Sequence, residues 1–417
     1  MKAENPSRRI TELDGIRGMA ILLVLIWHYG VCEIQPRPGT LLHYGIRTLA
    51  LTWSGVDLFF VLSGFLIGGI LLDNKDSTNY FSTFYVRRIC RIFPLYFLWV
   101  FLFIGPMLTG ASARFDWLFA KPLPLWSYLT FTQNVAMAQT DSFGPNWLGV
   151  TWSLAVEEQF YLVLPLMIFF LPSRRLPHVL ACIVLGAPGA RFILYAYGHW
   201  IFSPYMLMPC RADALMLGVL CACGMRQEGF TRYLTRHRAL LYGLFAFLLA
   251  VAGIFTYKNY MVVSFAMLSY GYSVLAMLYS CFLLIALTER RGLVTWVVRN
   301  PLMVRLGIIA YGVYLFHQGV SGLAHGILLN QTPQIAGWVG ADVTLLALLI
   351  TFTLAELSWL YFEKPLVVLG HSFKYHKVEK VHSRPLPIRF EVELPDPRGL
   401  PIVVEKPEIG PPAKPLP

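Results

Sequence analysis

Charged and titratable side chains occur inside several long apolar segments of this 417-residue sequence. Charged groups are costly inside a lipid bilayer, so residues of this kind usually have a function. An imidazole titrates near neutral pH and can take a proton from a hydroxyl, and a guanidinium can hold a phosphate through paired hydrogen bonds. The candidates are Arg17, His28, Asp57, Glu157, Glu158, Arg191, Arg211, Asp213, His317 and Glu356.

Arg17 and His28 share one face of the first apolar segment. They are eleven positions apart, so a helix turns by about 1100° between them, close to three full turns, and rises by about 16 Å. A phosphate at Arg17 would therefore let a pantetheine arm carry a thioester toward His28, the candidate general base. The alternative is an arginine that only reaches the membrane surface and a histidine satisfied within the core. The spacing leaves both interpretations open.

Further polar residues are expected at a depth similar to that of His28, and a carboxylate among them could orient the base. Trp152, Ser153, Glu157 and Tyr161 follow the i, i+4, i+8 spacing of one helix face. The alternative is a buried ion-pair network that only fixes the register of the helices. The residues of the expected cluster are Asp57, Glu157, Arg211, Asp213 and His317.

Two motifs support weaker hypotheses. Gly64 and Gly68, four residues apart, predict a close helix contact, and Ser63 beside them is a less favoured candidate for an acyl-carrying nucleophile. Arg87, Arg88 and Arg91 either mark a cytoplasmic loop, bind anionic lipid, or provide a second contact for donor phosphates.

Apolar spans must position these residues, because 56% of the sequence is hydrophobic and only 14% is charged. A soluble domain carries about 25% charged residues. We predict an all-α transmembrane bundle of ten helices, with segment 111–151 interfacial or re-entrant. The predicted spans are 13–32, 51–72, 92–110, 152–172, 178–197, 206–225, 239–257, 262–288, 303–327 and 338–362.

Alternate loops between these spans are rich in Lys and Arg, which predicts that both ends of the chain are cytoplasmic. This bias accounts for the net charge of +11, so we expect no nucleic-acid partner. The cysteine spacing does not resemble a metal site, and no metal is expected. We divide the chain into a transmembrane domain, 1–366, and a Pro-rich cytoplasmic tail, 367–417.

Seven motifs, spread from about residue 11 to residue 366, together resemble the acyltransferase family 3 membrane proteins. Each motif is weak alone, but their order is specific. They are LDGIRGMAILLVLIWH, with Arg17 and His28; GVDLFFVLSGFLIGG, with Asp57; FYVRRICRIFPLYF, with Arg87, Arg88 and Arg91; TWSLAVEEQFYLVLPL, with Trp152, Ser153, Glu157 and Tyr161; CRADALMLG, with Arg211 and Asp213; AYGVYLFHQ, with Tyr314 and His317; and YFEKP.

The resemblance implies ten transmembrane helices in the bacterial inner membrane and an acyl-CoA donor, usually acetyl-CoA. It also implies a carbohydrate or glycolipid acceptor at the outer side, and Arg17 and His28 match the family's Arg-x10-His motif. Some members carry a fused SGNH esterase-like domain, which this sequence does not show. The expected catalytic residues are His28, Glu157, Asp57 and His317, with Arg17, Arg87, Arg88, Arg91, Trp152, Ser153, Tyr161, Arg211, Asp213 and Tyr314 as substrate contacts.

Two other functions fit the same buried charges. A transporter would use them as an ion or substrate path, although no internal repeat is apparent in the sequence. A membrane anchor or assembly protein would tolerate changes at His28 and Glu157.

Overall fold

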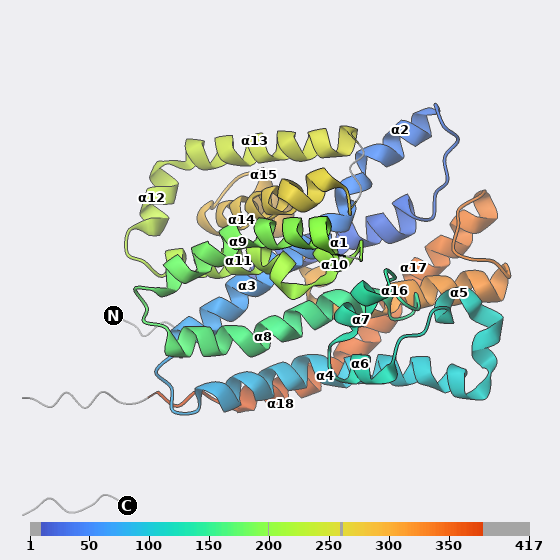
Figure 1. The fold of residues 1–417 in the computed structure, drawn as a ribbon, viewed down its shortest axis with the longest axis horizontal. Coiled ribbons are helices and arrows are strands. Elements are labelled where there is room, and N and C mark those ends of the chain that lie inside the picture. The colour runs from blue at the N-terminus through green and yellow to red at the C-terminus, as the bar shows by residue number, and fades with distance from the viewer. Residues whose placement is uncertain (1–9, 199, 259–261, 378–417) are drawn as a thin grey trace, which may run out of the picture. The chain divides into compact units, whose positions relative to one another are not determined.

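The computed structural model describes residues 10–377, apart from residue 199 and residues 259–261. It contains ten segments long and apolar enough to cross a membrane, as predicted, and in Figure 1 the long helices lie side by side. The ten segments are Thr11–Val31, Leu41–Asp73, Tyr80–Thr109, Gly149–Phe170, Leu176–Tyr197, Ser203–Met225, Arg238–Tyr257, Met267–Thr288, Pro301–Leu328 and Trp338–Ser372.

Several of these segments combine two helices. The helices are α1 (Thr11–Leu25) with a π-helical turn (Ile26–Val31), α2 (Leu41–Thr48), α3 (Gly55–Asp73), α4 (Tyr80–Thr109), α8 (Trp152–Phe170), α9 (Leu176–Tyr197), α10 (Ser203–Met206), α11 (Met208–Met225), α13 (Arg238–Tyr257), α14 (Tyr272–Thr288), α16 (Pro301–Leu328), α17 (Trp338–Ser358) and α18 (Lys364–Ser372).

Two predicted boundaries differ from those in the structure. Helix α4 begins at Tyr80, not near residue 92, because residues 80–91 contain no helix breaker, so Arg87, Arg88 and Arg91 lie on the helix itself. The last span continues beyond residue 362 through a π-helical turn into α18, which ends at Ser372. Part of the segment assigned to the tail is therefore helical, and residues 378–417 lie outside the described part of the chain.

Segment 111–151 does not form a spanning helix. It contains three short helices, α5 (Asp116–Phe119), α6 (Leu125–Leu129) and α7 (Gln133–Gln139), which follow the last residue of α4 (Figure 1). We call this end of the bundle the loop end. We call the opposite end, where Arg17 of α1 and Arg88 and Arg91 of α4 lie, the arginine end. Which side of a membrane each end faces remains a prediction.

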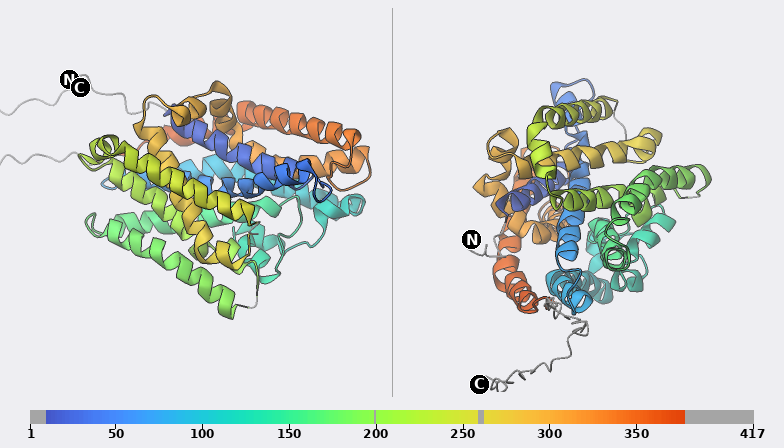
Figure 2. Two further views of the ribbon diagram at one scale, coloured as in Figure 1. Left: turned by 90° about the horizontal axis from the view of Figure 1, so that it is seen from above. Right: turned by 90° about the vertical axis from the view of Figure 1, so that its left-hand side faces the viewer.

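Figure 2 shows the helices of the bundle from two further sides. Glycines allow the central helices to approach each other closely. A Cβ atom on Gly64 of α3 would lie 1.9 Å from the carbonyl oxygen of Leu215 in α11. A Cβ atom on Gly18 of α1 would lie 1.9 Å from the carbonyl oxygen of Met303 in α16. Small residues at such crossings are typical of membrane helices. The close contact predicted at Gly64 is present, and α1 is fixed against α3 and α16.

Candidate active site

Two histidines from helices far apart in the sequence are in direct contact. Nε2 of His317 on α16 lies 3.3 Å from Nδ1 of His28, which lies in the π-helical turn after α1. The ring centroids are 4.7 Å apart, and the ring planes make an angle of 62°. The His317 residue is fully buried, while His28 retains partial exposure. Single π-helical turns occur frequently at functional sites.

Backbone carbonyls fix the tautomers of both rings. Nδ1 of His317 lies 2.8 Å from the carbonyl oxygen of Tyr314, and Nδ1 of His28 lies 3.0 Å from that of Val24. A carbonyl oxygen only accepts hydrogen bonds, so each Nδ1 carries a proton and each Nε2 carries a lone pair. The one Nδ1–H of His28 is then shared in a bifurcated hydrogen bond that both the Val24 carbonyl oxygen and Nε2 of His317 accept. Nε2 of His28 has no polar partner among the described residues, and it is left as a base.

Two residues that sequence reasoning missed hold the π-helical turn and the loop after it in place. The Tyr29 hydroxyl donates to the His317 carbonyl oxygen, 2.9 Å away, and also lies 2.9 Å from Thr351 Oγ1 in α17. The Glu33 carboxylate accepts from Ser321 Oγ and Thr344 Oγ1, both 2.7 Å away. The available signal was a carboxylate just past the end of a span, five residues after His28.

The ionised form of the Glu33 carboxyl is nevertheless disfavoured by its burial. Its burial raises the pKa of the carboxyl, and the donated hydrogen bonds and the nearby His325 oppose that shift only in part. His317, Ser321 and His325 are spaced by four along α16, so one helix face carries the histidine pair and the groups around Glu33.

Residues of α8 lie close to the pair but do not hydrogen-bond to His28. Ser153 Oγ lies 2.6 Å from the Tyr314 hydroxyl, and the Tyr314 ring centroid is 5.9 Å from that of His317. The Tyr161 hydroxyl donates to Glu157, 3.3 Å away, and lies 2.7 Å from Ser63 Oγ. The polar side chain that contacts the His28 ring is that of His317, and the role expected for a carboxylate such as Asp57 or Glu157 stays a prediction.

Three of the arginines predicted to contact the donor, Arg17, Arg88 and Arg91, lie at the arginine end. The charges of Arg17 and Arg88 act on both Arg91 and Glu157. Arg17 bonds to Asp14 at 2.8 Å, and its side chain remains 26% exposed. Within the described part of the chain, the buried Nε of Arg88 and Oε1 of Glu158 have no hydrogen-bond partner. These groups form a cationic site in which Arg91 lies 3.7 Å from Glu363 and the Nε of Arg88 has unfilled hydrogen-bonding capacity.

Arg87 points elsewhere. Its guanidinium donates two hydrogen bonds, of 3.0 and 2.7 Å, to the carbonyl oxygen of Phe373, and it lies over the ring of Tyr375. Of the four arginines predicted to contact a donor, the structure brings together Arg17, Arg88 and Arg91, while Arg87 fastens α4 to the segment after α18.

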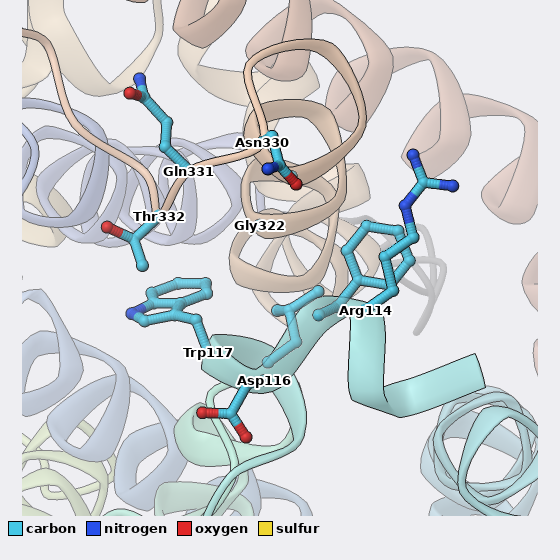
Figure 3. Close-up of a pocket in the computed structure, with 10 residues that line it drawn as sticks. Arg114, Asp116, Trp117, Gly322, Asn330, Gln331 and Thr332 are labelled. Atoms are coloured by element: carbon cyan, nitrogen blue, oxygen red, sulfur yellow. The ribbon is translucent and has the colours of Figure 1, made fainter. Parts of the chain in front are cut away.

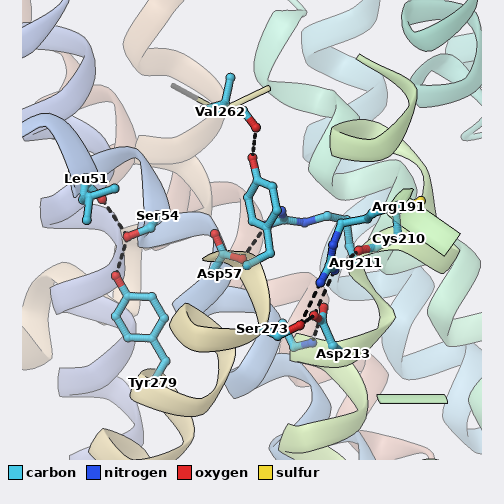
Figure 4. A network of polar contacts seen from close by, with 12 residues as sticks. Leu51, Ser54, Asp57, Arg191, Cys210, Arg211, Asp213, Val262, Ser273 and Tyr279 are labelled. Atoms are coloured by element: carbon cyan, nitrogen blue, oxygen red, sulfur yellow. Dashed lines mark hydrogen bonds and ion pairs between the residues drawn. The ribbon is translucent and has the colours of Figure 1, made fainter. Parts of the chain in front are cut away.

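Asp57, Arg211 and Asp213 belong to a separate ionic network (Figure 4). Asp57 pairs with Arg211, and Asp213 pairs with Arg191 at 2.9 Å; all four residues are about 1% exposed or less. The Arg211 guanidinium lies 4.0 Å from the ring centroid of Tyr272, while Trp152 packs against Tyr205 of the same region. In the described residues, no hydrogen bond or ion pair joins this network to His28 or His317. These residues fit the register-fixing network that was the alternative interpretation.

Metal ligands do not gather in the described part of the chain: no group of three His, Cys, Asp or Glu side chains there could hold an ion.

Comparison with known proteins gives a consistent result. Residues 10–360 match the model of the family described as "Acyltransferase domain". The YrhL protein of Bacillus subtilis, provisionally named a peptidoglycan O-acetyltransferase, is 29% identical over 388 residues, which cover 87% of this chain and 56% of that protein. The peptidoglycan O-acetyltransferase OatA of Listeria monocytogenes is 26% identical over 405 residues, covering 86% and 56%. The chain thus spans little more than half the length of these relatives. No solved structure matches it significantly.

Proposed function

This chain belongs to the acyltransferase domain family, and we propose that it is a multi-pass O-acetyltransferase of the bacterial inner membrane. The donor is acyl-CoA from the cytoplasm, with acetyl as the acyl group. The acceptor is a hydroxyl of a carbohydrate on the other side of the membrane, in the class of which peptidoglycan, named for the relatives, is an example. In this proposal the arginine end faces the cytoplasm and the loop end faces outward.

The donor phosphates bind at Arg17, Arg88 and Arg91, because guanidinium groups pair with phosphate oxygens through two parallel hydrogen bonds. The buried Nε of Arg88, which has no partner in the described residues, supports this placement. Arg87 is left out because its guanidinium is bonded to Phe373. The pantetheine arm extends along the face of α1 toward His28, over the roughly 16 Å that eleven helical residues span.

His28 acts as the general base through Nε2. It takes the proton of the acceptor hydroxyl while the hydroxyl oxygen attacks the thioester carbonyl carbon. The tetrahedral intermediate collapses, the C–S bond breaks, and the thiolate of CoA takes the proton back from His28. No proton is gained or lost overall. His317 accepts from Nδ1–H of His28, so it holds the ring in one orientation and shares the positive charge that forms on it.

The observation that carries this proposal is the His28–His317 contact, with an unpartnered Nε2 on a ring that keeps partial exposure. The test is to express the wild type and His28→Ala, confirm equal abundance in the membrane, and analyse purified surface glycans by mass spectrometry. We expect acetyl esters with the wild type and none with His28→Ala. Equal acetylation in the two strains would remove His28 as the base.

A further inference from the structure

A groove opens at the loop end, on the outer side of the histidine pair. It has two chambers of about 180 Å³ and about 610 Å³, and both are lined by Asp116, Trp117 and Thr332. The larger volume lies in the range of about 300–1,000 Å³ that small-molecule sites occupy. Figure 3 shows the smaller chamber, between the segment with Asn330, Gln331 and Thr332 and the turn that carries Arg114, Asp116 and Trp117; the Gln331 amide points away from that turn.

The groove adjoins the helix that carries His317. Gly322 and Gly326 of α16 line the smaller chamber, and Gly322 is five residues beyond His317, or about 7.5 Å along the helix axis. A Cβ atom on Gly322 would lie 2.7 Å from the Trp117 ring, so Trp117 rests directly on this helix. Asn146 Nδ2 donates to the Trp117 carbonyl oxygen at 2.8 Å and fixes that segment. The same five residues turn the helix by about 500°, so Gly322 lies about 140° around the axis from His317, and the groove borders another face of α16 than the one that carries the histidine pair. An extended ligand held in the groove would therefore continue past this helix to reach the base.

The chemistry of the lining is that of a glycan site. The Trp117 indole is partly exposed and offers a flat face to the C–H side of a sugar ring. Side-chain carboxylates and amides around it accept and donate hydrogen bonds to hydroxyl and acetamido groups. The charges of Arg114 and Lys121 balance those of Asp116 and Asp141, so the lining suits a neutral sugar better than a polyanion. The polar lining residues are Arg114, Asp116, Lys121, Asp141, Ser142, Asn146, Asn330, Gln331 and Thr332.

The backbone gives a second, independent observation. Four non-glycine residues in the described part of the chain have a positive φ, and three of them line the groove. These are Lys121 (55°), Asp141 (45°) and Asn330 (52°). Left-handed conformations are unfavourable for such residues, persist only where the surrounding structure imposes them, and concentrate at functional sites.

We propose that this groove binds the acceptor as a neutral, N-acetylated sugar chain stacked on Trp117, with Asp116 bonded to its hydroxyls. The inference rests on the proposed function, since it supplies the acceptor for the base at His28. Trp117 is a binding residue that holds the sugar in place; the reaction itself takes place at His28.

The test measures equilibrium binding of chitotetraose to the full chain in lipid nanodiscs by titration calorimetry. The parent is His28→Ala, so that transfer does not disturb the titration. Trp117→Ala in this background is expected to raise Kd by about tenfold, and Trp117→Phe, which keeps an aromatic face, by less than about threefold. Trp126→Ala is the matched control, because Trp126 lies in the same segment, is 62% exposed and lines neither chamber.

Asp116→Ala provides a second variant, since Asp116 is exposed and its loss does not endanger folding; Kd should rise by about threefold. The absence of saturable binding to the parent, or equal Kd values for the parent, Trp117→Ala and Asp116→Ala, would overturn the proposal. Binding does not need transfer. Sensitivity at Trp117 together with no acetylation by the wild type would leave the groove in place and refute the proposed function.

Discussion

The two buried polar clusters of this bundle, one around Arg211 and Arg191 and one around His28 and His317, differ in whether their polar groups have partners within the protein. Around Arg211 and Arg191, each cation is paired with a carboxylate inside the helices, and the aromatic ring of Tyr272 covers Arg211 (Figure 4). Around His28 the rings are neutral, each Nδ1 is tied to a backbone carbonyl, and one Nε2 is free. The ionic cluster pairs its charges with each other, although Oδ2 of Asp57 and Nη1 of Arg211 are buried without a hydrogen-bond partner in the described residues. The histidine cluster instead keeps a basic nitrogen that a substrate can reach.

The difference teaches that the presence of a buried charge does not by itself mark the reacting site. Removing one partner of a buried ion pair is strongly destabilising because it leaves an uncompensated charge. Removing a neutral imidazole leaves no such charge. Mutations in the histidine cluster should therefore lower the reaction rate, and mutations in the ionic cluster should lower the stability of the fold.

The largest expected effect is on rate. His28→Ala should lower kcat by about 10²–10⁴-fold, the usual contribution of a general base, while the protein remains folded. His317→Ala should lower kcat less, since it removes the orienting partner but leaves the base. Steady-state kinetics of acetyl transfer with purified variants measures both. A larger loss for His317→Ala than for His28→Ala would reverse the two roles.

The ionic cluster should respond in stability. Asp57→Ala should destabilise the protein by about 3–5 kcal/mol, because Arg211 would remain buried without its carboxylate. Thermal unfolding in detergent, followed by loss of monomer in size-exclusion chromatography, measures the effect. The double variant Asp57→Leu with Arg211→Met should recover much of that loss, since apolar replacement of a whole pair is often neutral. If Asp57→Ala were as stable as the wild type but inactive, the comparison would fail and Asp57 would belong with the base.

A third comparison concerns binding of the donor at the arginine end. Arg88→Gln with Arg91→Gln should raise KM for acetyl-CoA by about tenfold, because two contacts to phosphate are lost. The KM for an acetyl-pantetheine donor without the nucleotide should change little. Arg87→Gln is the matched control, as its guanidinium is held by Phe373. An effect at Arg87 equal to that of the pair would point to a general electrostatic role.

The smallest expected effect concerns Glu33, just beyond the histidine turn. Burial raises the pKa of its carboxyl in the folded protein, so the folded state holds the proton to a higher pH than the unfolded chain does. Its contribution to stability is complete below the unfolded pKa, about 4.3, and is lost as pH rises through the raised folded value.

Glu33→Gln removes this titration. The Tm of the wild type, compared with that of Glu33→Gln, should fall as the pH rises above the unfolded value of about 4.3. The titratable groups near this carboxyl are the ring of His325, the thiol of Cys32 and the phenol of Tyr29, and His325→Gln serves as the control for the histidine. A Tm difference that stays constant with pH would show that the carboxyl has an ordinary pKa in the folded protein.

Sequence reasoning located the helices better than the partners. The ten spans follow from apolar length alone, and the glycine spacing in α3 predicted the close crossing at Gly64. The sequence could not show that His28 meets a residue 289 positions away, since such pairing depends on how the helices pack. The pairing of Asp57 with Arg211 also depends on helix packing. From the sequence, we instead expected all the buried charges to share one cavity.

The π-helical turn explains the rest of what was missed. The predicted shared face assumes a uniform α-helix from Arg17 to His28, but residues Ile26–Val31 form a π-helical turn, which changes the direction of the side chains from there on. Tyr29 and Glu33, which fasten this part of the chain to α16 and α17, have no counterpart in a regular helical pattern.

The most direct test reconstitutes the purified protein in liposomes and supplies radiolabelled acetyl-CoA on one side and chitotetraose on the other. The wild type should move the label from acetyl-CoA to an ester on the sugar only when the donor faces the arginine end. His28→Ala at equal protein density should not. Equal transfer of label by both proteins, or transfer in either orientation, would contradict a base at His28 that connects a donor site at the arginine end with an acceptor site at the loop end.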